Sequence, residues 1–169
     1  MAIRELRVES DPILQTKTAL VQQIDQETRD QIQDMLDTMY AEDGIGLAAN
    51  QIGLNKRMFV MDISSKEEEP NPFVFINPEI VWLSEEKVSF EEGCLSVPGV
   101  YAPVIRSQRC RVRYRDIENK EQILEAEELM AVCIQHEVDH LNGLLFIDHL
   151  SHLKRKMLVN KSRKHRKKD

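Results

Sequence analysis

The segment His136-Glu137-Val138-Asp139-His140 has the residue types and the spacing that metal-assisted hydrolysis requires. Residues four positions apart lie on the same side of an α-helix, so the two imidazoles can face one ion. Glu137 can reach the open side of that ion and take a proton from a bound water. The alternative is a core helix whose histidines only form hydrogen bonds. Two inward imidazoles without partners would cost desolvation energy, which favours the metal site.

A catalytic metal of this type usually has three protein ligands, so the histidine pair needs a third. In zinc proteases the third ligand lies downstream, but the position of an extra His holds Phe146 and no Glu follows the motif. Upstream, Cys94 stands in a glycine-marked bend after a strand pattern at 88–90, and its thiolate would suit zinc or ferrous iron. An inert buried thiol is the commoner fate of a cysteine. Downstream candidates also remain, although each fits a solvated helix end better than a ligand: Asp148, His149 and His152.

A segment of small residues at 44–51, GIGLAANQ, leaves its backbone uncovered because it contains two glycines and two alanines. At its end, Gln51 offers a neutral amide that can donate a hydrogen bond to a developing oxyanion. The segment has neither the Lys-Ser/Thr pair nor the spacing of a phosphate-binding P-loop. Taken alone, such a segment more often reflects tight packing than a binding site.

Helices and strands must position these residues, and their order along the chain predicts an α+β fold. Apolar residues recur at helical spacing over about 25–40 and again over about 127–141, where Gly143 suits a helix stop. Runs rich in β-branched and aromatic residues predict short strands at 57–63, 73–83 and 109–115. Strands precede the second helix instead of alternating with helices, which favours α+β over βαβ units.

Composition indicates one soluble globular domain. The 169 residues are 41% hydrophobic and 31% charged, and the longest apolar run, 129–134, is too short for a membrane span. The first residues lack the apolar region of a secretory signal, so we expect a cytoplasmic protein. Three cysteines in such a chain predict free thiols, and Cys110 and Cys133 are expected to be buried and inert. Nine of the 23 Lys and Arg residues fall in 154–169, so an acidic body precedes a basic tail.

Three segments together resemble the peptide deformylases: GIGLAANQ at 44–51, EGCLS at 92–96 and QHEVDH at 135–140. They follow the order and approximate spacing of that family, and the resemblance covers about residues 6–153. It implies an α+β fold in which antiparallel or mixed β-sheets surround a central helix carrying the HExxH motif, with an N-terminal and a C-terminal helix. We therefore expect a catalytic domain at 1–153 followed by a basic C-terminal helix or tail at 154–169.

The resemblance also implies the reaction and its residues. A metal hydrolase of this family removes the formyl group from the N-terminal formyl-methionine of nascent polypeptides and releases formate. The ion would be Fe²⁺, which Zn²⁺, Ni²⁺ or Co²⁺ can replace, and Glu137 would move the proton. The Gln51 side-chain amide and the Leu95 backbone N–H would stabilise the oxyanion. The implied metal ligands are Cys94, His136 and His140.

The extended peptide is expected to lie beside Ile45 and Gly46 and near Gly99, so that main-chain hydrogen bonds give affinity without sequence selectivity. The methionine side chain needs an apolar slot, although its expected walls could equally be ordinary core residues: Ile45, Leu129, Val132 and Cys133. One departure from the family pattern is Gln15, which stands where an arginine often follows leucine. Any ion pair of that arginine is therefore in doubt here.

Other functions remain open at this stage. A zinc endopeptidase would use the same chemistry, but the missing downstream ligand and the upstream Cys94 oppose it. A non-catalytic metal-binding or RNA-binding module would depend on the basic tail and would need neither Glu137 nor Gln51. The tail could also dock the enzyme on ribosomal RNA near the nascent chain, because basic segments bind phosphates. The resemblance favours a monomer with no membrane partner.

Overall fold

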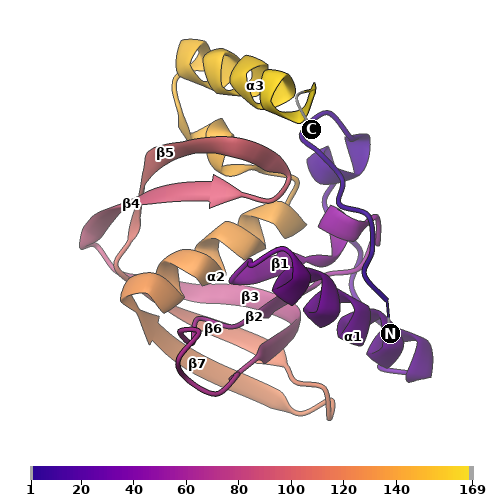
Figure 1. Ribbon diagram of the computed structural model, residues 1–169. Coiled ribbons are helices and arrows are strands. Elements are labelled where there is room, and N and C mark those ends of the chain that lie inside the picture. The colour runs from indigo at the N-terminus through magenta and orange to yellow at the C-terminus, as the bar shows by residue number, and fades with distance from the viewer. Residues whose placement is uncertain (1, 168–169) are drawn as a thin grey trace.

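The computed structural model describes residues 2–167, which form three α-helices and seven β-strands (Figure 1). The helices are α1 (Gln26–Ala41), α2 (Glu128–Leu141) and α3 (His152–Lys167), and short 3₁₀ turns lie at η1 (Pro12–Gln15), η2 (Ala49–Ile52) and η3 (Phe146–His149). The strands are β1 (Gly46–Ala48), β2 (Met58–Met61), β3 (Phe73–Leu83), β4 (Lys87–Cys94), β5 (Val97–Ser107), β6 (Arg109–Arg115) and β7 (Glu121–Glu127).

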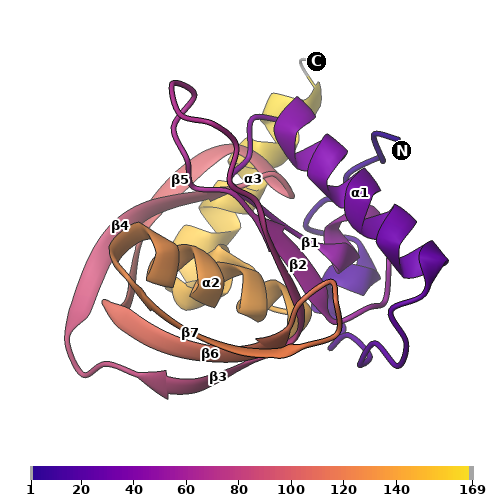
Figure 2. The ribbon, with the colours of Figure 1, turned by 90° about the horizontal axis from the view of Figure 1, so that it is seen from below.

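The strands form two separate antiparallel sheets. Five of them pair in the order β1-β2-β3-β6-β7, while β4 and β5 form a hairpin of their own. Helix α2, which carries the HExxH motif, lies between the hairpin and the larger sheet (Figures 1 and 2). The predicted α+β fold with sheets around this helix is confirmed. No helix within residues 2–167 is both long and apolar enough to cross a membrane.

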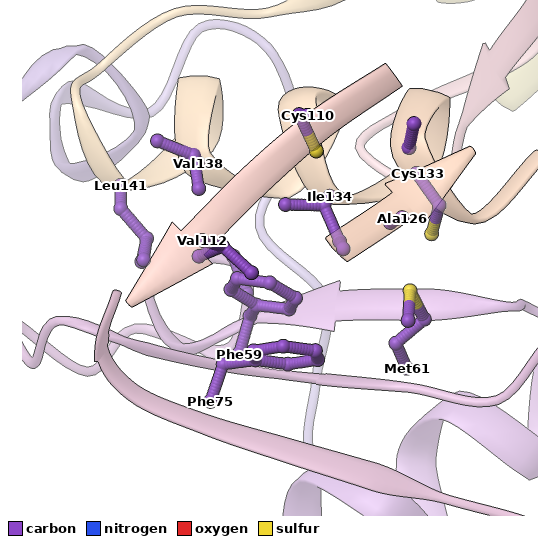
Figure 3. Packing of buried hydrophobic residues seen from close by; sticks show 12 residues of the cluster. Phe59, Met61, Phe75, Cys110, Val112, Ala126, Cys133, Ile134, Val138 and Leu141 are labelled. Carbon is purple, nitrogen blue, oxygen red and sulfur yellow. The ribbon is translucent and has the colours of Figure 1, made fainter. Parts of the chain in front are cut away.

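Apolar packing against the larger sheet anchors α2. The side chains of Ile134, Val138 and Leu141 are buried in one cluster with Phe59 and Phe75 (Figure 3). The two phenylalanine rings stack with their centroids 4.5 Å apart. Since each large buried apolar side chain stabilises the fold by about 1.5–3 kcal/mol, the helix with the histidines rests on a well-packed base.

The C-terminal end of α2 is set by local backbone geometry. At its C-terminal end, Gly143 adopts a left-handed φ of 81°. A Cβ at this position would lie only 2.7 Å from the backbone of Gln15. Glycine is therefore required for both conformation and space, and the predicted helix stop is confirmed.

Helix α1 packs on β1 and β2, on the face opposite to α2. Its N-cap is Asp25, whose carboxylate accepts a hydrogen bond from the Thr28 N–H at 2.9 Å. Along its buried face, Met35 and Met39 belong to the same cluster as Leu47 of β1. This packing holds the 44–51 segment beside α2.

The predicted helices and the strands at 73–83 and 109–115 agree with the structure to within one residue. Strands β5 and β7 were not predicted. Two prolines interrupt β5, but the hairpin leaves one edge of this strand without a β-ladder, so missing N–H donors are tolerated there. Strand β7 is rich in glutamate, and its pairing with the arginines of β6 stabilises it, as in the Arg111–Glu125 salt bridge.

The basic C-terminal segment forms α3, which begins at His152, two residues before the expected domain boundary. The helix packs on the outer side of β5 (Figure 1). Val159 and Ser162 are its buried residues. The last two residues of the expected tail, 168 and 169, lie outside the described residues.

Candidate active site

Three side chains that can bind a metal converge beside α2. Cys94 comes from the end of β4, while His136 and His140 lie one helical turn apart on α2. Their ligand atoms all lie within 4.8 Å of one another, and no other such cluster occurs in the described part of the chain. The hairpin and the helix thus bring Cys94 close to His140, although the two residues are 46 positions apart in the sequence.

The distances between these atoms suit one small metal ion. Cys94 Sγ lies 3.3 Å from His140 Nε2, which lies 3.1 Å from His136 Nε2. Around a tetrahedral ion with typical bond lengths, two nitrogens lie about 3.3 Å apart and a nitrogen and a sulfur about 3.5 Å apart. A divalent ion therefore fits this donor set.

The electrostatics of the two histidines also favour a cation. Burial alone would lower the pKa of His136, but hydrogen bonds with Cys94 and Glu92 raise this pKa to about 10. The surroundings therefore stabilise positive charge at this position. For His140, burial and the charge of His136 hold the pKa well below its usual value, which keeps this imidazole neutral. A neutral imidazole is the form that binds a metal.

A buried charge network orients His136. Its Nδ1 lies 2.8 Å from Glu92 Oε1, and Glu92 in turn accepts hydrogen bonds from Arg106 at 2.6 and 2.9 Å. The remaining guanidinium nitrogen of Arg106 donates to Asp139 at 2.8 Å, and His149 contacts the same carboxylate oxygen at 2.7 Å. A carboxylate on the second ring nitrogen holds the other nitrogen toward the ligand cluster.

The sequence analysis assigned no role to this network. Glu92 and Asp139 lie inside the motifs EGCLS and QHEVDH, next to Gly93-Cys94 and His140. Their position beside the proposed ligands could have marked them as residues that support the site. Arg106 lies in a strand between motifs, and nothing near it in the sequence marks it. Its role depends on the pairing of β4 with β5, which places Arg106 on the strand beside Glu92.

Glu137 lies next to the ligand cluster and is almost fully buried. Its Oε2 has no hydrogen-bond partner among residues 2–167, and burial raises the pKa of this carboxyl to about 7. A Cβ on Gly46 would lie 3.1 Å from the carboxyl group, so glycine makes room for it. A buried carboxyl that has one oxygen free of hydrogen bonds within residues 2–167 and a pKa near neutrality suits a group that accepts and returns a proton.

Gln51 is held in one orientation by Ala48 at the end of β1 and by the β4–β5 turn. The Ala48 N–H donates to Gln51 Oε1 at 2.9 Å, which identifies the other end of the amide as the donor. That Nε2 donates to Ser96 Oγ at 3.1 Å and points to Cys94 Sγ at 3.5 Å. Leu95 occupies the same turn, directly after Cys94. Both predicted oxyanion donors therefore belong to the surroundings of the thiol.

A cavity of about 440 Å³ opens beside the ligand cluster. Tyr101 also lines it, and a Cβ on Gly93 would lie 2.4 Å from the Tyr101 ring. The sequence analysis missed Tyr101, which is exposed on a strand that was not predicted. All six predicted substrate-binding residues lie on the cavity wall: Ile45, Gly46, Gly99, Leu129, Val132 and Cys133.

The remaining candidate ligands lie elsewhere. Asp148 accepts a hydrogen bond from the Leu145 N–H and pairs with Arg155, and His149 contacts Asp139, so both serve the region around η3. His152 is the first residue of α3. The cysteines are free, as predicted, and Cys110 and Cys133 are buried. Burial raises the pKa of the Cys110 thiol to about 11, consistent with an inert side chain.

Comparisons with known proteins agree with this geometry. Residues 3–156 match the model of the family described as polypeptide deformylase. The chain is 51% identical to a peptide deformylase from Phenylobacterium zucineum over 99% of both chains, and 52% identical to one from Mesorhizobium japonicum over 97% of this chain and 93% of the relative.

Solved structures show the same likeness. A crystal structure of peptide deformylase from Ehrlichia chaffeensis superposes with a TM-score of 0.94 at 38% identity, covering 99% of each chain. A second structure of the Ehrlichia chaffeensis enzyme, in complex with actinonin, has a TM-score of 0.93 at 40% identity and covers 98% of each chain. With a family model that spans most of its length and relatives of this identity, the chain belongs to the peptide deformylase family.

Proposed function

We propose that this protein removes the formyl group from the N-terminal formyl-methionine of nascent polypeptides and releases formate. One observation carries the proposal: the ligand atoms of Cys94, His136 and His140 converge next to the buried Glu137, whose Oε2 has no hydrogen-bond partner among residues 2–167, at the wall of a cavity. Membership of the peptide deformylase family agrees with this reaction.

Cys94, His136 and His140 would hold the catalytic ion, which we propose to be Fe²⁺, with Zn²⁺, Ni²⁺ or Co²⁺ as substitutes. Sulfur and imidazole donors suit ferrous iron and zinc, whereas calcium and magnesium prefer oxygen ligands. When bound, such an ion lowers the pKa of a water molecule and polarises a carbonyl group. Glu92, through Nδ1 of His136, holds that ring in the orientation for binding.

Glu137 would act as the proton carrier. Its carboxylate accepts the proton of the attacking water and then gives it to the nitrogen that leaves the formyl carbon. The pKa of about 7 that burial produces permits both steps near neutral pH. Gln51 Nε2 and the Leu95 N–H would donate to the oxygen that becomes negative during the attack.

The peptide would bind as an additional strand. Among residues 2–167, β1 pairs with β2 alone, and Gly46 at its start lines the cavity. A peptide beside this edge would form main-chain hydrogen bonds that do not depend on its sequence, while Gly99 borders it from the hairpin. Leu129, Val132 and Cys133 would surround the methionine side chain.

The role of Glu137 is tested by comparing Glu137→Gln with the wild-type chain. We expect formate release from a formyl-methionyl tripeptide to fall by about 10²- to 10⁴-fold, because the proton carrier is lost. Metal content should stay the same, since the three ligands remain. Glu91→Gln, which changes an exposed carboxyl at the cavity, is the matched control and should retain activity. Full activity of Glu137→Gln would refute this role.

The same assay separates the deformylase from a zinc endopeptidase. The wild-type protein should release formate from formyl-Met-Ala and leave an internal peptide bond intact. Cleavage of a blocked internal peptide at a similar rate would support the endopeptidase instead. The non-catalytic module predicts neither product.

We further propose that α3 docks the protein on ribosomal RNA. Its arginines form ion pairs within the protein: Arg155 pairs with Asp148, while Arg163 and Arg166 both pair with Glu9. Its lysines are exposed and available to phosphates: Lys154, Lys156, Lys161, Lys164 and Lys167. Such contacts weaken steeply as the salt concentration rises.

Replacing these five lysines by glutamine should abolish co-sedimentation with ribosomes at low salt while leaving deformylation of a free peptide unchanged. The wild-type protein should lose its association with ribosomes as salt is raised. Unchanged co-sedimentation of the glutamine variant would show that α3 does not mediate docking.

A further inference from the structure

Glu9 is a buried carboxylate in the segment before η1, far in the sequence from every residue of the proposed site. It accepts a hydrogen bond from Arg163 Nε at 2.9 Å, and Arg166 binds its other carboxylate oxygen. Burial alone would raise the pKa of Glu9, but the hydrogen bonds from Arg166 and Arg163 lower it. An ionised carboxylate therefore ties the N-terminal segment to the last turns of α3.

The backbone of the same residue holds the turn that carries the active-site thiol. The Glu9 N–H donates to the Ser96 carbonyl at 3.0 Å. Ser96 in turn donates its own N–H to Cys94 Sγ at 3.4 Å, and its hydroxyl accepts from Gln51 Nε2 at 3.1 Å. Ser96 thus links Glu9 by hydrogen bonds to the proposed metal ligand Cys94 and to the proposed oxyanion donor Gln51.

Helix α3 contacts the next residues of the hairpin directly. Ser162, which is fully buried, donates its hydroxyl hydrogen to the Pro98 carbonyl at 2.7 Å. Gly99 has a left-handed φ of 81°, and a Cβ there would lie 2.5 Å from the His165 ring. Pro98 and Gly99 both line the cavity, so the helix lies behind the wall along which the peptide is proposed to bind.

Few apolar contacts hold α3 in this place. Val159 belongs to the cluster that the hairpin forms with η3, and Leu158 packs against that cluster; the other buried side chain of the helix, Ser162, is polar. The Glu9 ion pairs add a charged attachment near the C-terminal end of the helix to these apolar contacts. Loss of their charge would let α3 and the 96–99 backbone shift together.

We propose that Glu9, with Arg163 and Arg166, is a positioning residue that holds the 96–99 backbone for peptide binding through α3. This inference rests on the proposed deformylase function. It implies that peptide affinity depends on a carboxylate that touches neither substrate nor metal. A substitution of the Glu9 side chain keeps the backbone hydrogen bond to Ser96, so Cys94 and Gln51 keep their contacts with that residue. The change acts through α3 on Pro98 and Gly99, and the proton carrier and the ligand set should be unaffected.

The test compares kcat and KM of the metal-loaded wild-type protein and Glu9→Gln on a formyl-methionyl tripeptide. We expect KM to rise about fivefold, with kcat within about twofold and metal content unchanged, because binding is lost equally in the ground and transition states. The double variant Arg163→Gln/Arg166→Gln should show the same rise. Combining all three changes should add nothing further, since they remove one interaction.

Two controls separate positioning from general destabilisation. Asp25→Ala removes the N-cap of α1, far from the hairpin, and should lower the melting temperature without changing KM. Glu9→Asp keeps the charge and should show a smaller rise in KM than Glu9→Gln. If KM of Glu9→Gln stayed at the wild-type value, or if kcat and metal content fell instead, the positioning role would be wrong.

Hydrogen exchange provides a readout that does not require turnover. Amides of residues 96–102 should exchange faster in Glu9→Gln than in the wild-type protein, while those of α1 should not change. If Glu9→Gln fails to fold, Glu9→Asp is measured in the same way. Absence of formate release by the wild-type chain would overturn the proposed function, whereas unchanged exchange at 96–102 would overturn this inference separately.

Discussion

At the scale of single residues, Arg106 carries more of the site than its place in the sequence indicates. Its guanidinium is buried and binds two carboxylates, Glu92 and Asp139, which flank the histidines. A buried carboxylate that loses its cation keeps its full desolvation cost and has no compensating attraction. The orientation of His136 therefore depends on a cation that lies on a different element.

Arg106→Ala should lower the free energy of unfolding by about 3–5 kcal/mol, because it leaves buried carboxylates unpaired. Arg111→Ala is the matched control, since Arg111 forms its salt bridge with Glu125 on the exposed face of the sheet. Its cost should stay below about 1 kcal/mol. Urea denaturation of both variants measures the difference, and equal losses would contradict the assignment of a buried network.

At the scale of elements, α3 is attached to the body by a charge that titrates. The pKa of Glu9 lies below its ordinary value of 4.5 because the arginine hydrogen bonds outweigh the effect of burial. A group whose pKa is lowered by folding stabilises the protein above its unfolded pKa. This stabilisation is lost as the pH falls through the lower, folded pKa.

The difference in unfolding free energy between the wild-type protein and Glu9→Gln should therefore be largest at neutral pH. It should shrink as the pH falls below about 4.5 and the wild-type carboxylate is protonated. Urea titrations from pH 7 downward check this, and the comparison with glutamine cancels the acid sensitivity of the other groups. A difference that did not change with pH would show that the charge of Glu9 is unimportant.

At the scale of the whole molecule, the proposed metal would join two layers. Cys94 belongs to the small hairpin, and His136 and His140 belong to the helix that packs on the larger sheet. An ion that binds only the folded arrangement stabilises it in proportion to its affinity and concentration. Metal binding and the stability of the fold should therefore be linked.

Removal of the metal by a chelator should lower the melting temperature, and returning Fe²⁺ under anaerobic conditions or Zn²⁺ should restore it. At a free metal concentration 100-fold above Kd, the stabilisation is about 2.7 kcal/mol. Cys94→Ser should largely lose this response, whereas Cys110→Ser, which changes a buried thiol outside the cluster, should keep it. Calorimetry with and without metal provides the measurement. An identical chelator response in both variants would exclude Cys94 as a ligand.

The sequence by itself determined those features that depend on neighbours along the chain. Helical periodicity located α1 and α2, enrichment in β-branched and aromatic residues located β3 and β6, and the spacing of His136 and His140 placed both rings on one side of a helix. These predictions succeeded because each depends on the geometry of a single element. The family motifs added the expected reaction and the expected third ligand, Cys94.

Only the tertiary structure decided which distant groups meet. From the residues alone, Cys94 competed with Asp148, His149 and His152, and the chain path of the hairpin brought the thiol to the histidines. The same holds for Arg106, whose side chain reaches Glu92 from the neighbouring strand, and for Glu9, which meets α3 across most of the chain. Long-range contacts of this kind follow from the packing of all layers together, and no local pattern encodes them.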